Sequence, residues 1–276
     1  MSPQNYADYC AEQVRTYDYD RYFTATFAPA DIRRGLLALY AFNLEIASAR
    51  ERVSEALLGE IRLQWWRDAV CEIYDGSVRE HAVAAELAAA IETFSLPKMS
   101  FDRMIDGRGF DMDEEAPEDI NAFGKYISAT SGELTYIGFR ICGVSGQDNQ
   151  ARLLGSVWGG VGLLRTAPFH LRQRRVYFPR DVLGKTGVTV SMLAENPAGI
   201  DIAPAVNVLS EYLLDKLMAV KKIEKKARPA AAYVSLAMGY LKRLHAGGND
   251  VFATRLECAG IARQLRILRA VITGWV

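Results

Sequence analysis

The chain has 276 residues, half of them hydrophobic, which is enough for one large domain or two small ones with a buried core. Its 33 Lys and Arg balance its 33 Asp and Glu, so net charge does not favour nucleic acid or another acidic polymer as a partner. The 4 cysteines form no CxxC pair and there are only 3 histidines, which disfavours a zinc site and favours a reducing compartment.

Hydrophobic periodicity predicts helices along almost the whole chain. In chain order, apolar side chains recur at helical spacing in residues 32–53, 55–76, 82–94, 120–143, 147–167, 203–227, 230–244 and 252–276. Gly76, Pro97 and the Gly247-Gly248 pair stand where such helices should stop. Few strands are expected, because no alternating runs flank a hairpin turn. The sequence therefore predicts an all-α fold with a single domain over residues 1–276.

Neither end of the chain predicts insertion into a membrane. The start, "MSPQNYADYCAEQ", is too polar for a secretory signal. No apolar run approaches the about 20 residues that span a bilayer. We therefore expect an intracellular, cytoplasmic protein.

The last helix could nevertheless place the protein on a membrane surface. It carries Arg255, Arg263, Arg266 and Arg269 on one arc, Ile261, Leu265, Leu268 and Ile272 on another, and Trp275 near its end. One interpretation is a cationic amphipathic helix on an anionic surface, peripheral to the inner membrane. The other, which is commoner, packs the apolar arc on the domain and leaves the arginines in water. The same two interpretations apply to a second basic patch, formed by Lys221, Lys222, Lys225, Lys226 and Arg228.

Five segments in collinear order resemble the squalene/phytoene synthase family of head-to-head prenyl transferases. They are "FTATFAPADIRRGLLALYAFN", "LQWWRDAVCEIYDG", "MIDGRGFDMD", "YISATSGELTYIGFRICG" and "LGSVWGGVGLLRTAPFHLRQRRVYFPRDVLGKTGV", within residues 20–190. The resemblance implies an isoprenoid-synthase-like helical barrel around a central apolar cavity. It also implies two aspartate-rich motifs that hold Mg²⁺ against the substrate diphosphates, where the metal neutralises departing charge.

The aspartate-rich motifs have lost most of their carboxylates. After Asn43, the aspartate places of the first motif hold Ala47, Ser48 and Glu51. After Arg165, those of the second hold Thr166 and His170, with Pro168 between them, where it should kink or end the helix. Because Mg²⁺ needs several hard oxygen ligands, we expect no metal site and no cofactor here. Magnesium is expected only if ligands have been displaced to other positions.

The degenerate first motif, "AFNLEIASARERVSE", resembles one branch of this family. That branch contains the mitochondrial complex I assembly factors and their bacterial relatives, and "LLRTAPFHLRQRRVYFPRD" is similar to it as well. The resemblance implies a non-catalytic role in respiratory complex I assembly, with complex subunits or assembly proteins as partners. Two alternatives remain. One is an active farnesyl or geranylgeranyl diphosphate transferase with displaced ligands, and the other is a protein that binds an isoprenoid or lipid.

Charged residues near the motifs have competing interpretations. Arginines could hold a phosphate or an anionic lipid without metal, or serve only ion pairing and solubility; these are Arg165, Arg172, Arg174 and Arg175. Glu51 and Glu55 form either a motif displaced by one turn or, as we favour, a solvated helix face.

Three further candidates are interpreted as structural. Asp102 and Asp106 match DxxxD but should cap or pair at the surface, and the acidic run 111–119 should be a solvated loop. His170 lacks a nucleophile placed beside it by any motif, so a structural histidine is favoured over a catalytic base.

Overall fold

The computed structural model describes residues 3–53, 55–113, 115–253 and 260–276, and within these ranges it contains helices and no strand. The α-helices are α1 (Pro3–Tyr17), α2 (Tyr19–Ala25), α3 (Ala30–Ala47), α4 (Ala56–Tyr74), α5 (Ala82–Phe94), α6 (Lys98–Gly109), α7 (Ile120–Ile127), α8 (Glu133–Ile141), α9 (Asp148–Arg172), α10 (Arg180–Gly184), α11 (Val190–Glu195), α12 (Ala203–Met218), α13 (Arg228–Ala231), α14 (Ala237–Ala246) and α15 (Gly260–Thr273). The all-α prediction is confirmed.

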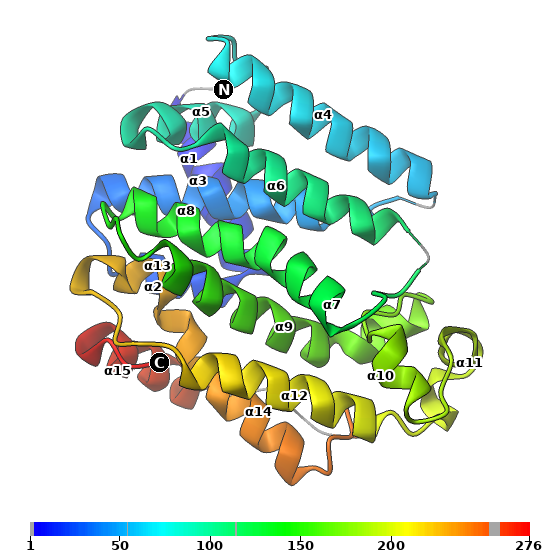
Figure 1. Cartoon of the computed structure of the whole chain (residues 1–276). Coiled ribbons are helices and arrows are strands. Elements are labelled where there is room, and N and C mark those ends of the chain that lie inside the picture. Colours follow the sequence, from blue (N-terminus) through cyan, green and yellow to red (C-terminus); the bar gives the residue numbers. More distant parts are fainter. Residues whose placement is uncertain (1–2, 54, 114, 254–259) are drawn as a thin grey trace.

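Helix α9 crosses the middle of the molecule and organises the layers around it (Figure 1). Helices α7 and α8 lie along one side of α9, and α12 and α14 lie along the other. Helices α4, α5 and α6 form the layer beyond α8, and α15 lies at the opposite end beside α13 and α2. Short 3₁₀ turns at Phe110–Met112, Pro197–Gly199, Lys225–Ala227 and Ala232–Leu236 join these elements.

Large aromatic side chains fill the space between the layers. Phe42 of α3 packs edge-on against Trp66 of α4 and Phe101 of α6, with ring centroids 5.3 and 5.6 Å apart. Trp158 of α9 packs against Tyr233, which is fully buried, at 5.2 Å. Such pairs add to the free energy gained from burying their apolar area. Packed rings therefore fix α3 against α4 and α6, and α9 against the 3₁₀ turn that carries Tyr233.

The predicted helix over residues 120–143 is interrupted by a π-helical segment, Ser128–Gly132, between α7 and α8. This segment lies against α9, where a Cβ at Gly155 would come within 2.1 Å of the Ser131 carbonyl oxygen. Only glycine permits so close an approach of two backbones. Asp119 begins α7, because its Oδ1 accepts a hydrogen bond from the Ala122 amide at 2.7 Å.

Several predicted helix ends are wrong. The helix predicted over 32–53 ends at Ala47, where the chain enters a turn. Pro168 does not end α9, which continues to Arg172. The helix predicted over 203–227 ends at Met218 instead. Beyond it, the Ile223 amide donates to the Gly274 carbonyl at 2.8 Å, so contact with the C-terminal segment replaces helical bonding.

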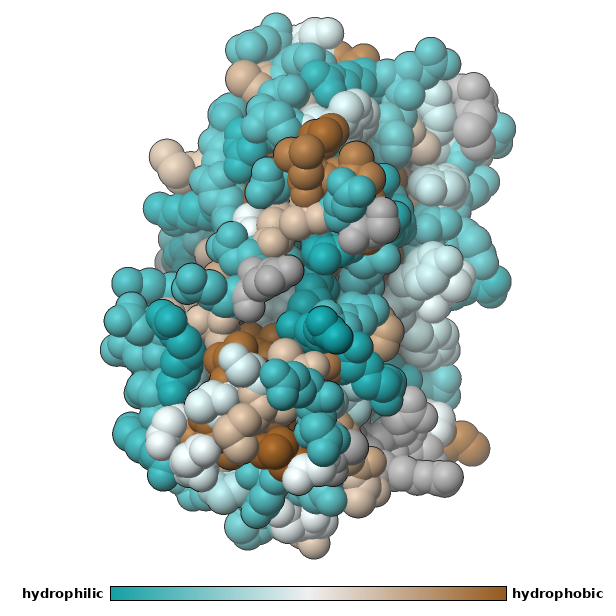
Figure 2. Space-filling view, turned by 90° about the vertical axis from the view of Figure 1, so that its right-hand side faces the viewer, coloured by the Kyte–Doolittle hydropathy of each residue, from teal (hydrophilic) through white to brown (hydrophobic). Residues whose placement is uncertain are grey.

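Two groups of apolar side chains stay exposed. One lies at the start of α4 and comprises Leu57, Leu58 and Ile61; hydrophobic patches show among hydrophilic atoms on this end of the molecule (Figure 2). The other is the apolar arc of α15, which faces away from the domain. The expectation that this helix packs its apolar arc on the domain is therefore wrong. Arg255, assigned to the same helix, lies outside the described residues. None of the described helices combines the length and apolarity that a membrane crossing requires.

Candidate functional site

The first motif lies at the end of α3, and its polar side chains are engaged by the protein itself. Ala47 is the last residue of the helix, and the Ser48 hydroxyl donates to the Leu44 carbonyl at 2.6 Å. Glu51 follows in an exposed turn beyond the helix. The one carboxylate that remains of this motif therefore points into solvent, apart from the helix that carried the pattern.

Two other polar residues of α3 are buried. Asn43 is 7% exposed, and its Oδ1 accepts no hydrogen bond. Glu45 is equally buried and accepts from Arg52 at 3.0 Å and from Arg62 at 3.2 Å. Since a buried carboxylate needs such partners, both arginines act to stabilise Glu45.

In the second motif, the two residues that stand in place of carboxylates, Thr166 and His170, are hydrogen-bonded to each other. The Thr166 hydroxyl donates to the Gly162 carbonyl at 2.8 Å, so it accepts from His170 Nε2, which lies 2.9 Å away. His170 Nδ1 is buried without a partner. Burial, aided by the positive charge of nearby Arg175, lowers the pKa of His170 to about 4. The imidazole is therefore neutral at pH 7.

A buried polar network links α6 and the segment after it to the motif region. Asp111 is 5% exposed, and its Oδ1 accepts from the hydroxyls of Tyr126 and Tyr177, each at 2.7 Å. Arg108 donates to Asp111 Oδ2 at 3.2 Å and to the Tyr126 oxygen at 2.9 Å. Burial raises the pKa of both tyrosines, so each keeps the proton that it donates. The network thus pairs a buried cation with a buried anion.

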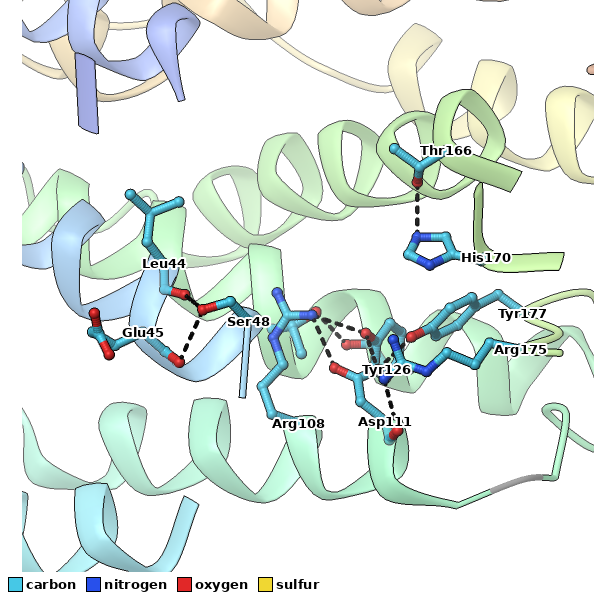
Figure 3. Close-up of polar contacts among 11 residues, drawn as sticks. Leu44, Glu45, Ser48, Arg108, Asp111, Tyr126, Thr166, His170, Arg175 and Tyr177 are labelled. Carbon is cyan, nitrogen blue, oxygen red and sulfur yellow. Dashed lines mark hydrogen bonds and ion pairs between the residues drawn. The ribbon is translucent and has the colours of Figure 1, made fainter. Parts of the chain in front are cut away.

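This network lies between the two motifs. In Figure 3 the Arg108 side chain rises from α6 between Ser48 on one side and His170 on the other. The Tyr177 ring packs against that of His170, with centroids 4.9 Å apart. The pocket beside His170 has a volume of only about 10 Å³, which is about the room for one water molecule. The network of Arg108, Asp111 and Tyr177 therefore reaches His170 of the second motif.

The burial of Asp111 corrects the interpretation of residues 111–119 as a solvated loop. Sequence reasoning assigned no role to Arg108, Asp111, Tyr126 and Tyr177. The one available signal was the spacing of Arg108 and Asp111, which are three residues apart and face each other at a helix end. The two tyrosines reach Asp111 from distant segments, so no local pattern could have indicated them.

The four arginines proposed for anion binding do not gather around one point. The Arg165 guanidinium lies over the Tyr240 ring, 4.2 Å from its centroid. Arg175 donates to the Asp111 carbonyl at 3.0 Å. Arg172 is the last residue of α9 and Arg174 lies in the turn after it with a φ of 60°, and both are exposed.

The donor set does not fit magnesium. Ser48 and Thr166 use their hydroxyls in hydrogen bonds to their own helices, and His170 is bonded to Thr166. Throughout the described residues, no three His, Cys, Asp or Glu side chains lie close enough to share a metal ion. The other DxxxD match is a surface feature, as predicted: Asp102 pairs with Lys98 at 2.9 Å and Asp106 with Arg67 at 2.7 Å.

Comparison with known proteins decides the family. The squalene/phytoene synthase family model matches residues 14–265. The chain belongs to the squalene/phytoene synthase family. Among solved structures, a dehydrosqualene synthase in complex with a ligand superposes with a TM-score of 0.81 at 16% identity, covering 98% of this chain and 96% of that one.

Within this family the chain resembles two kinds of relative. It is 30% identical over 255 residues to NADH dehydrogenase (ubiquinone) complex I, assembly factor 6 of Bos taurus, covering 90% of this chain and 77% of that protein. It is 26% identical over 218 residues to the phytoene synthase of Cereibacter sphaeroides, covering 72% of this chain and 59% of that protein. The match to the assembly factor is both longer and higher in identity.

Proposed function

We propose that this member of the squalene/phytoene synthase family acts in the assembly of respiratory complex I. The similarity to complex I assembly factor 6 over 255 residues carries the proposal. The motif region supports it, because the aspartate places hold an alanine, a serine, a threonine and a histidine, and the last three side chains are hydrogen-bonded within the protein. In this proposal the helical fold is retained, whereas the carboxylates that would bind Mg²⁺ for prenyl transfer are absent from the motif places.

The proposed partners are subunits or assembly proteins of that complex, with the chain at the inner membrane surface. The exposed apolar arc of α15 supports this location. A chain that acts by contact rather than by catalysis needs an outer surface, whereas a synthase needs an interior cavity.

Deletion of the gene tests the proposal. Assembled NADH dehydrogenase, resolved on native gels and stained for activity, should fall in the deletion strain and recover with the wild-type gene on a plasmid. A variant carrying Glu51→Ala should complement fully, because that carboxylate is exposed and unused in the proposed role. Unchanged assembly in the deletion strain would overturn the proposal.

Binding of a prenyl diphosphate separates this role from the two alternatives. The transferase alternative requires farnesyl or geranylgeranyl diphosphate to bind tightly in a Mg²⁺ titration and to lose that binding with Glu51→Ala. The lipid-binding alternative requires a bound isoprenoid or lipid in native mass spectrometry after gentle purification. We expect neither metal-dependent binding of a prenyl diphosphate nor a ligand carried in an interior cavity. The first result would support the transferase alternative, and the second would support the lipid-binding alternative.

A further inference from the structure

Helix α15 meets the domain with the opposite face from that expected of an amphipathic surface helix. Ile261, Leu265, Leu268 and Ile272 follow one stripe at i, i+4, i+7 and i+11, and all four are exposed, Ile261 by 76% and Ile272 by 66%. The face that meets the domain buries Ile267 and Ala270. The helix therefore leaves its larger apolar face exposed, with no partner among the residues that the structure describes.

Polar anchors hold α15 in this orientation. Arg263 pairs with Asp20 of α2, whose side chain is 4% exposed. Arg228 donates to the Val271 carbonyl at 2.9 Å and so satisfies the end of the helix. Because a buried carboxylate fixes one side of α15, rotation of the apolar stripe into the domain would leave Asp20 unpaired, which is costly. The outward stripe is thus built into the fold.

Cations flank the exposed stripe near the end of the helix. The segment after α12 is tied to Gly274 through the Ile223 amide, and it carries four exposed lysines beside that end: Lys221, Lys222, Lys225 and Lys226. Its one acidic residue, Glu224, accepts from Gln147 at 2.6 Å. This segment and its lysines therefore lie at the same end of the domain as the C-terminal end of α15.

A basic hollow completes this surface. It has a volume of about 340 Å³, and its charged lining is Lys242, Arg266 and Arg269, with Trp275 at its edge. Among the described residues that line it, none has an acidic side chain. Arg266 lies over Gly239, where a Cβ would come within 1.8 Å of its Nη1, so the glycine makes room for the guanidinium. Guanidinium and ammonium groups are suited to bind a phosphate oxygen.

We propose that α15, with the lysines 221–226, docks on an anionic phospholipid bilayer, and that Lys242, Arg266 and Arg269 hold a headgroup phosphate in this hollow. The apolar stripe enters the acyl boundary while the surrounding cations meet the anionic headgroups. Trp275, which is 57% exposed at the helix end, lies where an indole favours the interface. The inference deepens the membrane location in the proposed function, but it does not depend on the role in complex I assembly.

Vesicle co-sedimentation of the full chain tests this surface. Vesicles of phosphatidylcholine alone are compared with vesicles of phosphatidylcholine and phosphatidylglycerol, at low and high salt. We expect binding to the anionic vesicles only, weakened by salt. Brominated lipids should quench Trp275, since Trp66 and Trp158 are buried and the half-buried Trp65 lies on α4, at the other end of the molecule from α15. The quenching should disappear with Trp275→Phe.

Two variants and a matched control locate the contact. Ile261→Ser with Leu265→Ser and Ile272→Ser should lower partitioning about tenfold or more, because three apolar side chains no longer enter the bilayer. Lys242→Glu with Arg269→Glu should lower it at least about fivefold. The control, Leu57→Ser with Ile61→Ser, removes exposed apolar side chains from α4 and should bind like the wild type.

Several outcomes would overturn the inference. They are equal binding to both vesicle types, unchanged binding by the stripe variant, or loss of binding in the α4 control alone. A wild-type chain that ignores vesicles but forms a dimer through α15 in analytical ultracentrifugation would assign the stripe to a second copy instead. None of these results bears on the deletion phenotype, so the two proposals can fail separately.

Discussion

Two regions of the molecule differ in what they bury. The motif region between α3 and α9 buries charged and polar side chains, whereas the outer face of α15 exposes apolar ones. In the motif region, Arg108 and Asp111 form a buried ion pair to which two tyrosines donate hydrogen bonds. On α15, apolar side chains that could fill a core are exposed to the outside. A site that needs no ligand can be closed by the protein's own side chains, whereas a surface that stays apolar in water indicates an external partner.

The two regions should also differ in what they contribute: the motif region to the stability of the fold, and the face of α15 to binding. Asp111 is satisfied by three donor groups, so its loss should be felt throughout the fold. The stripe on α15 contributes little to folding, because its side chains are exposed in the folded chain as they are in the unfolded one. The predictions below test this contrast, from the largest expected effect to the smallest.

Removing the buried anion of the network should cost the most. Asp111→Ala leaves Arg108 as a buried cation without its carboxylate, and we expect the free energy of unfolding to fall by about 3–5 kcal/mol. Urea denaturation followed by circular dichroism measures the change. Asp106→Ala is the matched control, because it breaks an exposed pair with Arg67 and should cost at most about 1 kcal/mol. Equal losses in the two variants would mean that the network does not stabilise the motif region.

The neutral state of His170 should make the same region sensitive to acid. Its pKa is about 4 in the folded chain, against about 6.5 for an unperturbed histidine, so the unfolded chain binds the proton more readily. Stability from this group is present above pH 6.5 and is lost as the pH falls towards 4, by up to about 3 kcal/mol.

The difference between wild type and His170→Gln isolates this contribution from the carboxylates that titrate in the same range. The difference between the urea unfolding midpoints at pH 7 and pH 4.5 should be larger for the wild type than for the variant. The exposed His245→Gln serves as control and should follow the wild type. Parallel curves for the wild type and His170→Gln would show that the imidazole is not kept neutral by burial.

Substitution of the exposed stripe should leave the fold almost unchanged. Leu265→Ser with Ile272→Ser should alter the free energy of unfolding by no more than about 0.5 kcal/mol each, since both side chains are exposed. Ile267→Ala on the buried face of the same helix should cost about 2–5 kcal/mol. A large loss from the double serine variant would mean that the stripe packs on the protein, and the contrast between the two regions would disappear.

Magnesium should have the smallest effect. Ligands that bind only the folded state raise the melting temperature, and the groups at the motif places are engaged by the protein itself. Thermal unfolding should therefore give the same midpoint with and without Mg²⁺ in the presence of farnesyl diphosphate. A rise that needs both components would indicate that ligands have been displaced rather than lost.

The sequence by itself determined the helices and the gaps in the motifs. Helical periodicity is a local property, so the helices over residues 30–47 and 82–94 could be recognised without any contact across the fold, although the first was predicted to continue to residue 53. The places held by Ala47, Ser48, Thr166 and His170 could also be identified, because they follow recognisable segments at fixed spacing. The family and its all-α fold followed from these two kinds of local information.

Only the tertiary structure decided which faces are inside. Amphipathicity shows that Ile261, Leu265 and Ile272 share a face of α15, but the face that meets the domain depends on a buried partner, Asp20, far away in sequence. In the same way, Asp111 looked like the start of a solvated acidic loop until Tyr126 and Tyr177 closed over it. Burial is a property of contacts between distant segments, and the free energy of a charge or an apolar side chain depends on burial more than on its neighbours in the chain.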